Sequence, residues 1–268
     1  MLKNKLVVVT QASADARHGL VALLTSRGKQ VYELPTIRII KKRLTVAARA
    51  AMRNFNAYDY LIFTSAHTVA FFTPRGLRRS SAPSRIGIRP QLTARLAGSA
   101  HRARIIAIGS ATAAAAAQRG FHATVMPDRS TSADIAKCLP ALRGKNILLP
   151  RAATAPRDFI ERLKKKGARV TMVSLYATVS VTDADTKFEK ALADGRIGCF
   201  TFTSPSTVFG LSKRIKKPMM VKKVRGVPAV CIGPRTARSA RAFGFKKVIT
   251  ARTFTAEGIV KELRHALP

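Results

Sequence analysis

The sequence has no tryptophan, only four tyrosines and only three cysteines among its 268 residues. Cys138, Cys199 and Cys231 are odd in number and widely spaced, and none has a second cysteine or a histidine close enough to form a metal-binding knuckle. We therefore expect the cysteines to be small buried hydrophobic residues in a reducing compartment.

Long hydrophobic runs are also missing. No apolar run approaches the roughly 18 to 20 residues that span a bilayer, and the run LVVV at residues 6–9 is too short for the core of a signal peptide. We expect a cytoplasmic protein with no membrane segment.

Three common catalytic motifs are absent. The first expected strand is not followed by GxGxxG, there is no phosphate loop of the GK[ST] type, and there is no HExxH. These absences disfavour dinucleotide, nucleoside triphosphate and zinc hydrolase chemistry, and the five histidines are isolated from one another. An enzyme built from this sequence has to orient a substrate that carries its own reactivity.

Acidic residues are scarce, and the resulting charge is extreme. Lysine and arginine number 49 against 13 aspartates and glutamates, a formal net charge of +36. Two stretches without any acid, residues 75–104 and 213–225, are especially basic. Such an excess attracts polyanions, so we expect nonspecific nucleic-acid binding in solution. The absence of tryptophan, the small number of tyrosines and the lack of a known reading motif disfavour a dedicated nucleic-acid function.

An internal repeat organises the chain. IGSATA at residues 108–113 returns as IGPRTA at residues 232–237, 124 positions later and in step with flanking matches. With 47% hydrophobic residues, the chain can form two domains of about 130 residues each.

Each copy of this repeat predicts a strand, a tight glycine turn and a helix. Residues 104–108 are an apolar strand and residues 111–118 are nearly all alanine, with Ser110 or its neighbour able to cap the helix. In the second copy Pro234 falls in the first helical turn, where proline is tolerated. Both helix starts suit an anionic group, although any strand-to-helix turn in an α/β protein has this form.

A second pair of repeats is FTSAHTV at residues 63–69 and FTSPSTV at residues 202–208. Each follows a buried strand and predicts a helix capped by a hydroxyl, a role that needs no function. The unit of strand 5–10, helix 15–27 and strand 30–34 recurs at 145–150, 156–166 and 169–173.

Alternating strands and helices throughout the chain predict parallel sheets covered by helices on both faces. About ten strands divide into two sheets of five. The carboxyl ends of the strands, or the helix starts beyond them, carry Thr10, Ser65, Thr112, Pro150, Ser204 and Thr236. Two such edges facing each other would form a basic cleft for a large, multiply charged anion.

Six motifs in register resemble uroporphyrinogen-III synthase, and the resemblance covers essentially the whole chain. They are YDYLIFTSA at 58–66, IGSATA at 108–113, LLPR at 148–151, LYAT at 175–178, FTSPS at 202–206 and CIGPRTA at 231–237. The resemblance implies two flavodoxin-like α/β domains joined by a two-stranded β ladder. One domain would comprise residues 1–35 plus 182–268 and the other residues 41–173, with residues 36–40 and 174–181 as the linkers.

The resemblance also implies an activity. Hydroxymethylbilane, a linear tetrapyrrole with eight carboxylates, would be closed to uroporphyrinogen III with loss of water and inversion of ring D. No cofactor or metal is implied. We expect a monomer that can receive its substrate from hydroxymethylbilane synthase.

In this family the tyrosine of the second linker is the candidate acid that helps the hydroxyl leave, and Tyr176 has that place. The alternative is an aromatic residue that only packs. The substrate-binding positions implied by the resemblance are Thr10, Ser65, Ala66, Gly109, Ser110, Thr112, Arg151, Ser204, Pro205, Ser206, Gly233 and Thr236.

Two positions depart from the family pattern. Gln11 and Ala177 stand where the family usually has arginine. The alternative function is therefore a noncatalytic relative that binds nucleic acid or another polyanion.

Overall fold

The computed structural model describes residues 5–12, 19–73, 102–126, 139, 142–155 and 157–267. Cys138, the start of the expected helix 15–27 and most of the basic stretch 75–104 lie outside the described residues. The chain divides into two compact units, Met1–Ile40 with Thr178–Pro268 (unit 1) and Lys41–Ala177 (unit 2).

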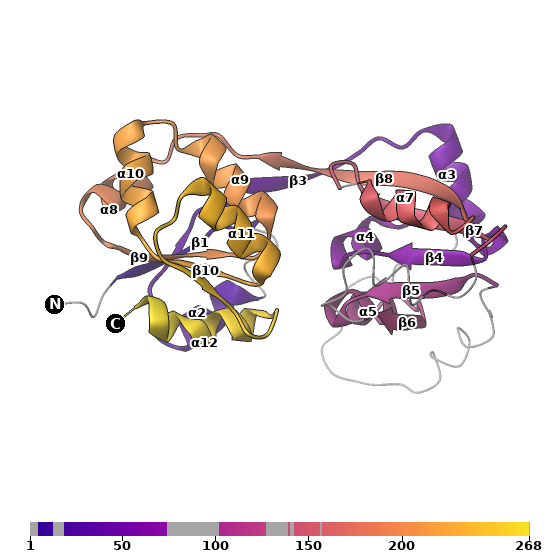
Figure 1. Cartoon of the computed structure of the whole chain (residues 1–268), viewed down its shortest axis with the longest axis horizontal. Helices are drawn as coiled ribbons and strands as arrows, with labels where there is room; N and C mark the ends of the chain where they lie inside the picture. The colour runs from indigo at the N-terminus through magenta and orange to yellow at the C-terminus, as the bar shows by residue number, and fades with distance from the viewer. Residues whose placement is uncertain are drawn as a thin grey trace. The chain divides into compact units, whose positions relative to one another are not determined.

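Unit 1 is built on a five-stranded sheet in the order β11-β10-β9-β1-β2, and all its strand pairs are parallel (Figure 1). The strands are β1 (Leu6–Val9), β2 (Val31–Glu33), β9 (Ile197–Phe202), β10 (Ala229–Cys231) and β11 (Val248–Thr250). The helices are α2 (Leu20–Ser26), α8 (Thr186–Ala193), α9 (Pro205–Arg214), α10 (Pro218–Gly226), α11 (Pro234–Phe243) and α12 (Ala256–Ala266).

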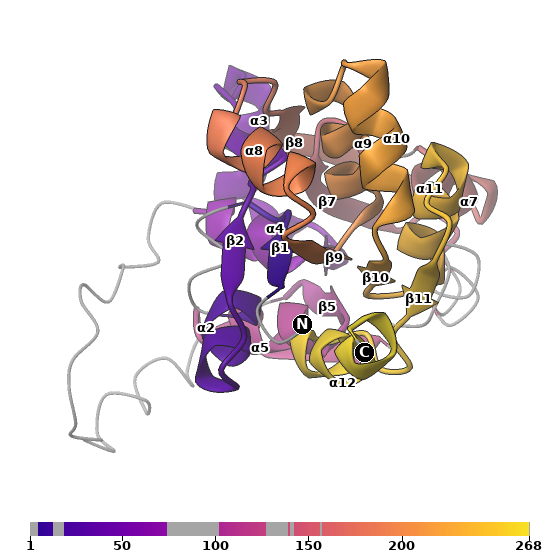
Figure 2. The same ribbon diagram turned by 90° about the vertical axis from the view of Figure 1, so that its left-hand side faces the viewer.

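Helices cover both faces of this sheet, as Figure 2 shows, with α8 to α11 on one face and α2 and α12 on the other. The side chains of strand β1 pack alternately against both helix layers. Val8 packs among the residues under α8 to α11, whereas Val7 and Val9 pack against α2 and α12. A strand buried on both faces reads as a continuous apolar run, which is why LVVV does not alternate with polar residues.

Unit 2 carries a sheet in the order β3-β8-β7-β4-β5-β6. The strands of this sheet are β3 (Ile37–Lys41), β4 (Tyr60–Phe63), β5 (Arg104–Ile108), β6 (Ala123–Met126), β7 (Asn146–Ala152) and β8 (Arg169–Ser180). Residues 37–40 of β3 and 178–180 of β8 fall within unit 1 by the division above. Its helices are α3 (Val46–Arg53), α4 (Ala66–Phe71), α5 (Ser110–Ala117), α7 (Asp158–Lys165) and the 3-10 turn η1 (Phe55–Ala57). Edge-to-face contacts among Phe55, Phe63, Phe72 and Phe121 fill part of its core.

The predicted parallel α/β class is confirmed, and the two units share one strand order. In unit 1 the order β2-β1-β9-β10-β11 is the flavodoxin-like order 2-1-3-4-5. Reading β8-β7-β4-β5-β6 in unit 2 gives the same arrangement, with β4 taking the place of β9. This agreement is what a duplication would produce, and the duplication itself stays a prediction.

The predicted strand at 169–173 and the predicted extended linker at 174–181 join without a break, because β8 is one continuous strand of 12 residues. The division into domains and linkers stays a prediction. Strand β3 lies beside β8, where the Lys42 amide donates to the Leu175 carbonyl and the Val181 amide donates to the Thr36 carbonyl, both at 2.9 Å. Backbone pairing therefore continues along β8 beyond the end of its other neighbour, β7.

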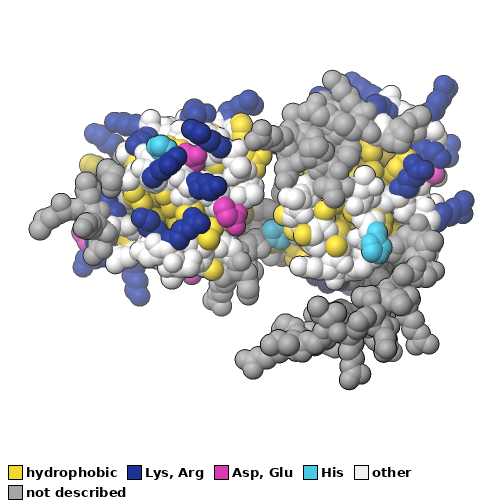
Figure 3. Space-filling model, turned by 90° about the horizontal axis from the view of Figure 1, so that it is seen from below, with side chains coloured by type: hydrophobic (Ala, Val, Ile, Leu, Met, Phe, Trp, Pro, Cys, Tyr) yellow, Lys and Arg dark blue, Asp and Glu magenta, His cyan; other side chains and the backbone are white. Residues whose placement is uncertain are grey.

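The surface is dominated by cations. On the face in Figure 3, lysine and arginine side chains outnumber acidic ones. Among the described residues, no helix is long and apolar enough to cross a membrane.

Gly210 of helix α9 lies so close to Thr36, the residue just before β3, that a side chain at position 210 would not fit. A Cβ at Gly210 would collide with the Thr36 carbonyl, whereas a Cβ at Gly226, which ends α10, would meet no atom within 4 Å.

We expect Gly210→Ala to lower the free energy of unfolding by about 1–3 kcal/mol through overpacking. We expect Gly226→Ala to change it by less than about 1 kcal/mol. Urea denaturation of both variants measures this difference, and equal effects would contradict the close approach of α9 to Thr36.

Candidate active site

The edge where the strand order reverses is the expected ligand site of such a sheet. In unit 2 this point lies between β4 and β7, which pair in parallel through Tyr60 with Ile147 and Leu61 with Leu148. The carboxyl end of β4 leads through Ser65 into α4, and β7 ends with Arg151 and Ala152.

A bulge brings Tyr176 to this edge. Along β7 and β8, Arg151 is opposite Ser174 but Ala152 is opposite Tyr176, so β8 holds one extra residue at that point. Bulges re-aim side chains and are common beside active sites. The Tyr176 ring stacks on Phe71 with a centroid distance of 5.4 Å and lies 5.9 Å from the ring of His67.

The hydroxyl of Tyr176 lies 3.1 Å from the hydroxyl of Ser65. Ser65 Oγ also lies 2.8 Å from Thr68 Oγ1 and accepts a hydrogen bond from the Thr68 amide at 3.2 Å. Ser65 therefore caps α4, as predicted, and at the same time orients Tyr176. Tyr176 is only 7% exposed and makes both ring and hydroxyl contacts, so its two suggested roles, acid and packing residue, both stay open.

Three residues around Tyr176 were not predicted: His67, Thr68 and Phe71. His67 and Thr68 lie inside the FTSAHTV repeat, directly after the predicted Ser65. Phe71 lies four residues after His67 in α4, and residues four apart lie on the same side of a helix. The helical period could therefore have indicated that Phe71 lies near the same edge.

Arg151 is buried, with 4% of its surface exposed, at the end of β7. Burial lowers the pKa of its guanidinium, and the Asp158 carboxylate at the start of α7 acts in the opposite direction. A buried arginine keeps its charge and five donors, so it suits an anionic partner.

The first copy of the glycine turn needs its glycine. Gly109 precedes α5 with a φ of 89°, a left-handed conformation that disfavours other residues. The sequence predicts that Ser110 or its neighbour caps the helix; the helix begins at Ser110, and its neighbour Gly109 is the cap residue, with no side chain to accept a bond. Thr112 is buried in the first turn, and Ala66 begins α4.

The second copy differs. Gly233 has a φ of −172°, which any residue adopts, and α11 begins at Pro234 as predicted. Thr236 is buried in the first turn of α11, in the place that Thr112 has in α5.

In unit 1 the strand order reverses between β1 and β9, and the hydroxyls there turn inward. Thr10 Oγ1 donates to the Thr201 carbonyl at 2.7 Å, and Thr201 Oγ1 donates to the Val8 carbonyl at 3.0 Å. Thr36 Oγ1 lies 3.0 Å from the Thr10 carbonyl and 2.8 Å from the Thr207 carbonyl. Thr10 is fully buried, so its hydroxyl joins strands within the unit.

Ser204 precedes α9, but the expectation that its hydroxyl caps the helix is wrong. The Thr207 amide donates to the Ser204 carbonyl at 3.2 Å, and Thr207 Oγ1 donates to the same oxygen at 2.7 Å. The Ser204 hydroxyl is instead 2.8 Å from that of Ser206, with the exposed Pro205 between them. Ser204 with Ser206, and Ser65 with Tyr176, are thus the predicted residues that the structure joins directly.

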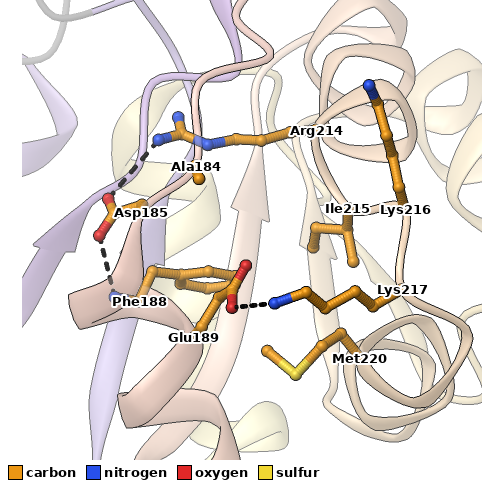
Figure 4. Close-up of a pocket in the computed structure, with 9 residues that line it drawn as sticks. All are labelled: Ala184, Asp185, Phe188, Glu189, Arg214, Ile215, Lys216, Lys217 and Met220. Carbon is orange, nitrogen blue, oxygen red and sulfur yellow. Dashed lines mark hydrogen bonds and ion pairs between the residues drawn. The ribbon is translucent and has the colours of Figure 1, made fainter.

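A pocket in unit 1 contains no predicted site residue (Figure 4). It is lined by Ala184, Asp185, Phe188, Glu189, Arg214, Ile215, Lys216, Lys217 and Met220. Four of its five charged side chains are paired, since Lys217 pairs with Glu189 at 2.9 Å and Arg214 lies 3.6 Å from Asp185; the fifth is Lys216. Arg214 also donates to the Pro35 carbonyl at 2.7 Å, so this cluster braces the chain before β3.

The thiols of Cys199 and Cys231 are unreactive because they are buried. Burial raises the pKa of Cys199 and of Cys231 to about 12, so neither thiol is a nucleophile near neutral pH. Both cysteines are buried and free, as expected. Within the described residues, no group of three or more His, Cys, Asp or Glu could hold a metal ion.

Comparison with known proteins gives a consistent picture. A family model described as uroporphyrinogen-III synthase HemD matches residues 18–261. The uroporphyrinogen-III synthase of Synechococcus elongatus is 23% identical over 264 residues, covering 97% of this chain and 94% of the relative. The porphyrin biosynthesis protein HemD of Ruminiclostridium josui is 25% identical over 251 residues, which are 91% of this chain but only 45% of that longer protein.

Solved structures agree on the fold. A mutant uroporphyrinogen III synthase of Thermus thermophilus matches with a TM-score of 0.64 and 19% identity, covering 98% of each chain.

Tyr32 offers a test of the cluster of Asp185 and Arg214 that contacts the chain before β3, because the Tyr32 hydroxyl donates to Asp185 at 2.7 Å. Burial and the neighbouring carboxylate raise the pKa of Tyr32 to about 12 by disfavouring the phenolate. Its stabilising contribution should be complete below about pH 10, the pKa of an unfolded tyrosine, and should be lost as the pH rises toward 12.

We expect the difference in phenolate absorbance between wild type and Tyr32→Phe to titrate near pH 12 in the folded protein. In guanidinium chloride it should titrate near pH 10. Circular dichroism in the same titration checks that the protein stays folded. A folded-state difference centred near pH 10 would refute the contact with Asp185.

Proposed function

The chain belongs to the uroporphyrinogen-III synthase family, and from this premise we propose that it closes hydroxymethylbilane to uroporphyrinogen III. The reaction loses water and inverts ring D, as the resemblance implies. The match of the family model over residues 18–261 is the observation that carries this proposal.

The chemistry of the candidate site supports the proposal. Hydroxyls and helix starts line the sheet edges, and the polar groups around Tyr176 form no carboxylate pair. Such a site suits a substrate whose electron-rich pyrroles expel a hydroxyl with little help. The protein then has to orient the chain of pyrroles and keep the reactive intermediate from closing without inversion.

We propose that Tyr176 helps the hydroxyl to leave. In this role the phenol donates its hydrogen toward the departing oxygen while the carbon–oxygen bond breaks and water leaves. Ser65 then donates to Tyr176 Oη and Thr68 donates to Ser65 Oγ, which the separations of 3.1 and 2.8 Å allow. One direction of donation along three hydroxyls stabilises negative charge on the phenolic oxygen.

We propose that carboxylates of the substrate bind at the helix starts and hydroxyls of each unit. The positions are Thr10, Ser65, Ala66, Gly109, Ser110, Thr112, Arg151, Ser204, Pro205, Ser206, Gly233 and Thr236. Backbone amides in the first turns of α5, α9 and α11 are the expected donors, because most amides of a first turn have no partner within their helix. Pro205 and Pro234 carry no amide hydrogen, and the Thr207 amide already donates to the Ser204 carbonyl. Thr10, Thr112 and Thr236 are buried, so they would act by shaping the backbone of these turns.

Further parts of the proposal follow from the reaction and the charge. The protein works as a cytoplasmic monomer and takes its unstable substrate from hydroxymethylbilane synthase. The net charge of +36 also attracts nucleic acid without sequence preference.

The isomer formed decides between catalysis and mere binding. Purified protein given freshly made hydroxymethylbilane should yield the type III isomer, identified by chromatography after oxidation to the porphyrin. Formation of the type I isomer alone, as in buffer without protein, would favour the noncatalytic alternative.

Removing the Tyr176 hydroxyl tests its role. We expect Tyr176→Phe to lower kcat for the type III isomer about 10- to 100-fold, at or below the lower end of the roughly 100- to 10,000-fold contribution of a general acid, because the substrate supplies most of the reactivity. Ser65→Ala should lower it about fivefold, corresponding to one hydrogen bond of about 1 kcal/mol.

The control is Tyr58→Phe. It removes a phenol just before β4, at the opposite end of that strand from Ser65, and should change kcat less than about twofold. Wild-type kcat in Tyr176→Phe would leave Tyr176 only as a packing residue.

A further inference from the structure

Helix α11 carries a row of arginines on its outer side. Arg235, Arg238 and Arg241 recur every three residues and are all exposed, whereas Thr236, Ala237 and Ala240 face inward and are buried. Residues three apart lie on one side of a helix, about 4.5 Å apart along its axis. The sequence thus builds α11 with small residues against the sheet and arginines toward solvent.

More cations extend this row past the end of the helix. The Lys246 amide donates to the Arg225 carbonyl at 2.9 Å, which brings the exposed Lys246 and Lys247 beside the end of α10. Arg225 lies with its guanidinium 5.3 Å from the Phe243 ring centre and donates to the Phe243 carbonyl at 2.7 Å. We name Arg225, Arg235, Arg238, Arg241, Lys246 and Lys247 the α11 basic face.

No acid compensates this face. The sequence has no aspartate or glutamate between Asp194 and Glu257, an interval that holds 14 lysines and arginines. Within the described part of the chain, none of the six cations pairs with a carboxylate. Elsewhere in unit 1 the acids are engaged: Glu189 pairs with Lys217, Asp194 with Arg196, and Glu262 with Arg252.

Helix α11 differs in this respect from α12, on the other face of the sheet, which carries Glu257 and Glu262 together with Lys261 and Arg264. On the face in Figure 3, acidic side chains lie among the basic ones of unit 1. Like charges three or four residues apart destabilise a helix by about 0.2–0.5 kcal/mol per pair. The α11 basic face therefore carries a standing repulsion that an external polyanion would relieve.

We propose that the α11 basic face binds the phosphate backbone of nucleic acid. Arginine forks match phosphate oxygens, and such interfaces need positive charge rather than an apolar centre. A membrane-bound helix would need apolar residues on its exposed side, and a protein interface would need an apolar core. On α11, Ala237 and Ala240 are buried in unit 1 and the outer side carries the arginines. The exposed Met219 begins α10 and is not part of the α11 basic face.

This binding is separate from cyclisation. Arg238, Arg241, Lys246 and Lys247 are none of the residues assigned to the candidate site. They can therefore be replaced without touching that chemistry, while Arg225 and Arg235 are left in place because of their contact with Phe243 and their position at the start of α11.

The test compares two variants with the same loss of charge. The face variant is Arg238→Gln, Arg241→Gln, Lys246→Gln and Lys247→Gln. The control variant is Lys29→Gln, Arg43→Gln, Arg104→Gln and Arg169→Gln. These four exposed cations lie far apart in the sequence, in different strands and connecting segments. Fluorescence anisotropy measures binding to a 24-base-pair DNA duplex of mixed sequence and to a single-stranded RNA of 24 nucleotides, over a series of salt concentrations.

We expect the face variant to bind both probes at least about tenfold more weakly than wild type at about 100 mM salt. For the DNA duplex, the slope of log affinity against log salt concentration should become smaller in magnitude by up to about 3.6, which is about 0.9 for each of four phosphates that the variant no longer neutralises. The control variant should lose less than about threefold. The face variant should also be at least as stable to urea as wild type at low salt, because repulsion along α11 is removed.

Three results would overturn the proposal. Equal losses in both variants would assign binding to net charge alone. Binding to phosphatidylserine vesicles that depends on the four face residues, without binding to either nucleic acid, would assign the face to membranes. A loss of cyclase kcat/KM in the face variant, with nucleic-acid binding unchanged, would assign it to capture of the substrate.

Discussion

Parallel pairing of strands is the constraint on which the structure depends. It sends the carboxyl ends of the parallel strands to the same edge of each sheet and returns the chain through helices on the faces. In unit 1 this pairing joins Thr10 to the carbonyl of Thr201, 191 positions away in sequence. In unit 2 it places the start of α4 beside the end of β7. Polar residues that follow different strands are therefore brought together at this edge.

The site that forms in unit 2 is built from hydroxyls and rings. The bulge between β7 and β8 turns Tyr176 toward Ser65, and Phe71 and His67 hold its ring. A hydroxyl network has little power to create a strong acid or base, but it orients a phenol well. This is the equipment expected when the substrate supplies most of the reactivity and the enzyme selects one of its possible cyclisations.

The few acidic residues explain how such a basic chain holds together. Asp59 accepts from the Asn146 amide at 2.8 Å and from Lys145 at 3.0 Å, and the backbone bond first and then the lysine hold its pKa below the ordinary value. Asp185 caps α8, accepts from Tyr32 and lies beside Arg214. Because these carboxylates serve local structure, the surplus of cations is left on helix surfaces such as α11, where solvent and counterions screen them.

The sequence by itself determined the alternation of strands and helices, because apolar runs, alanine-rich stretches and glycine turns act locally. It also indicated Ser65, Tyr176 and the first helical turns through repeats and resemblance. The continuous β8, the bulge beside Arg151, the contact of Ser65 with Tyr176 and the inward hydroxyl of Thr10 were decided only by tertiary structure. Each depends on the register between strands far apart in the chain, and a single residue of register moves a side chain to the other face of the sheet. The caps differ for two reasons, although Ser65 and Ser204 are both the serine of FTS. Ser206, which stands where the first copy has His67, contacts the Ser204 hydroxyl locally, whereas the Ser65 hydroxyl contacts Thr68 and, through the tertiary fold, Tyr176.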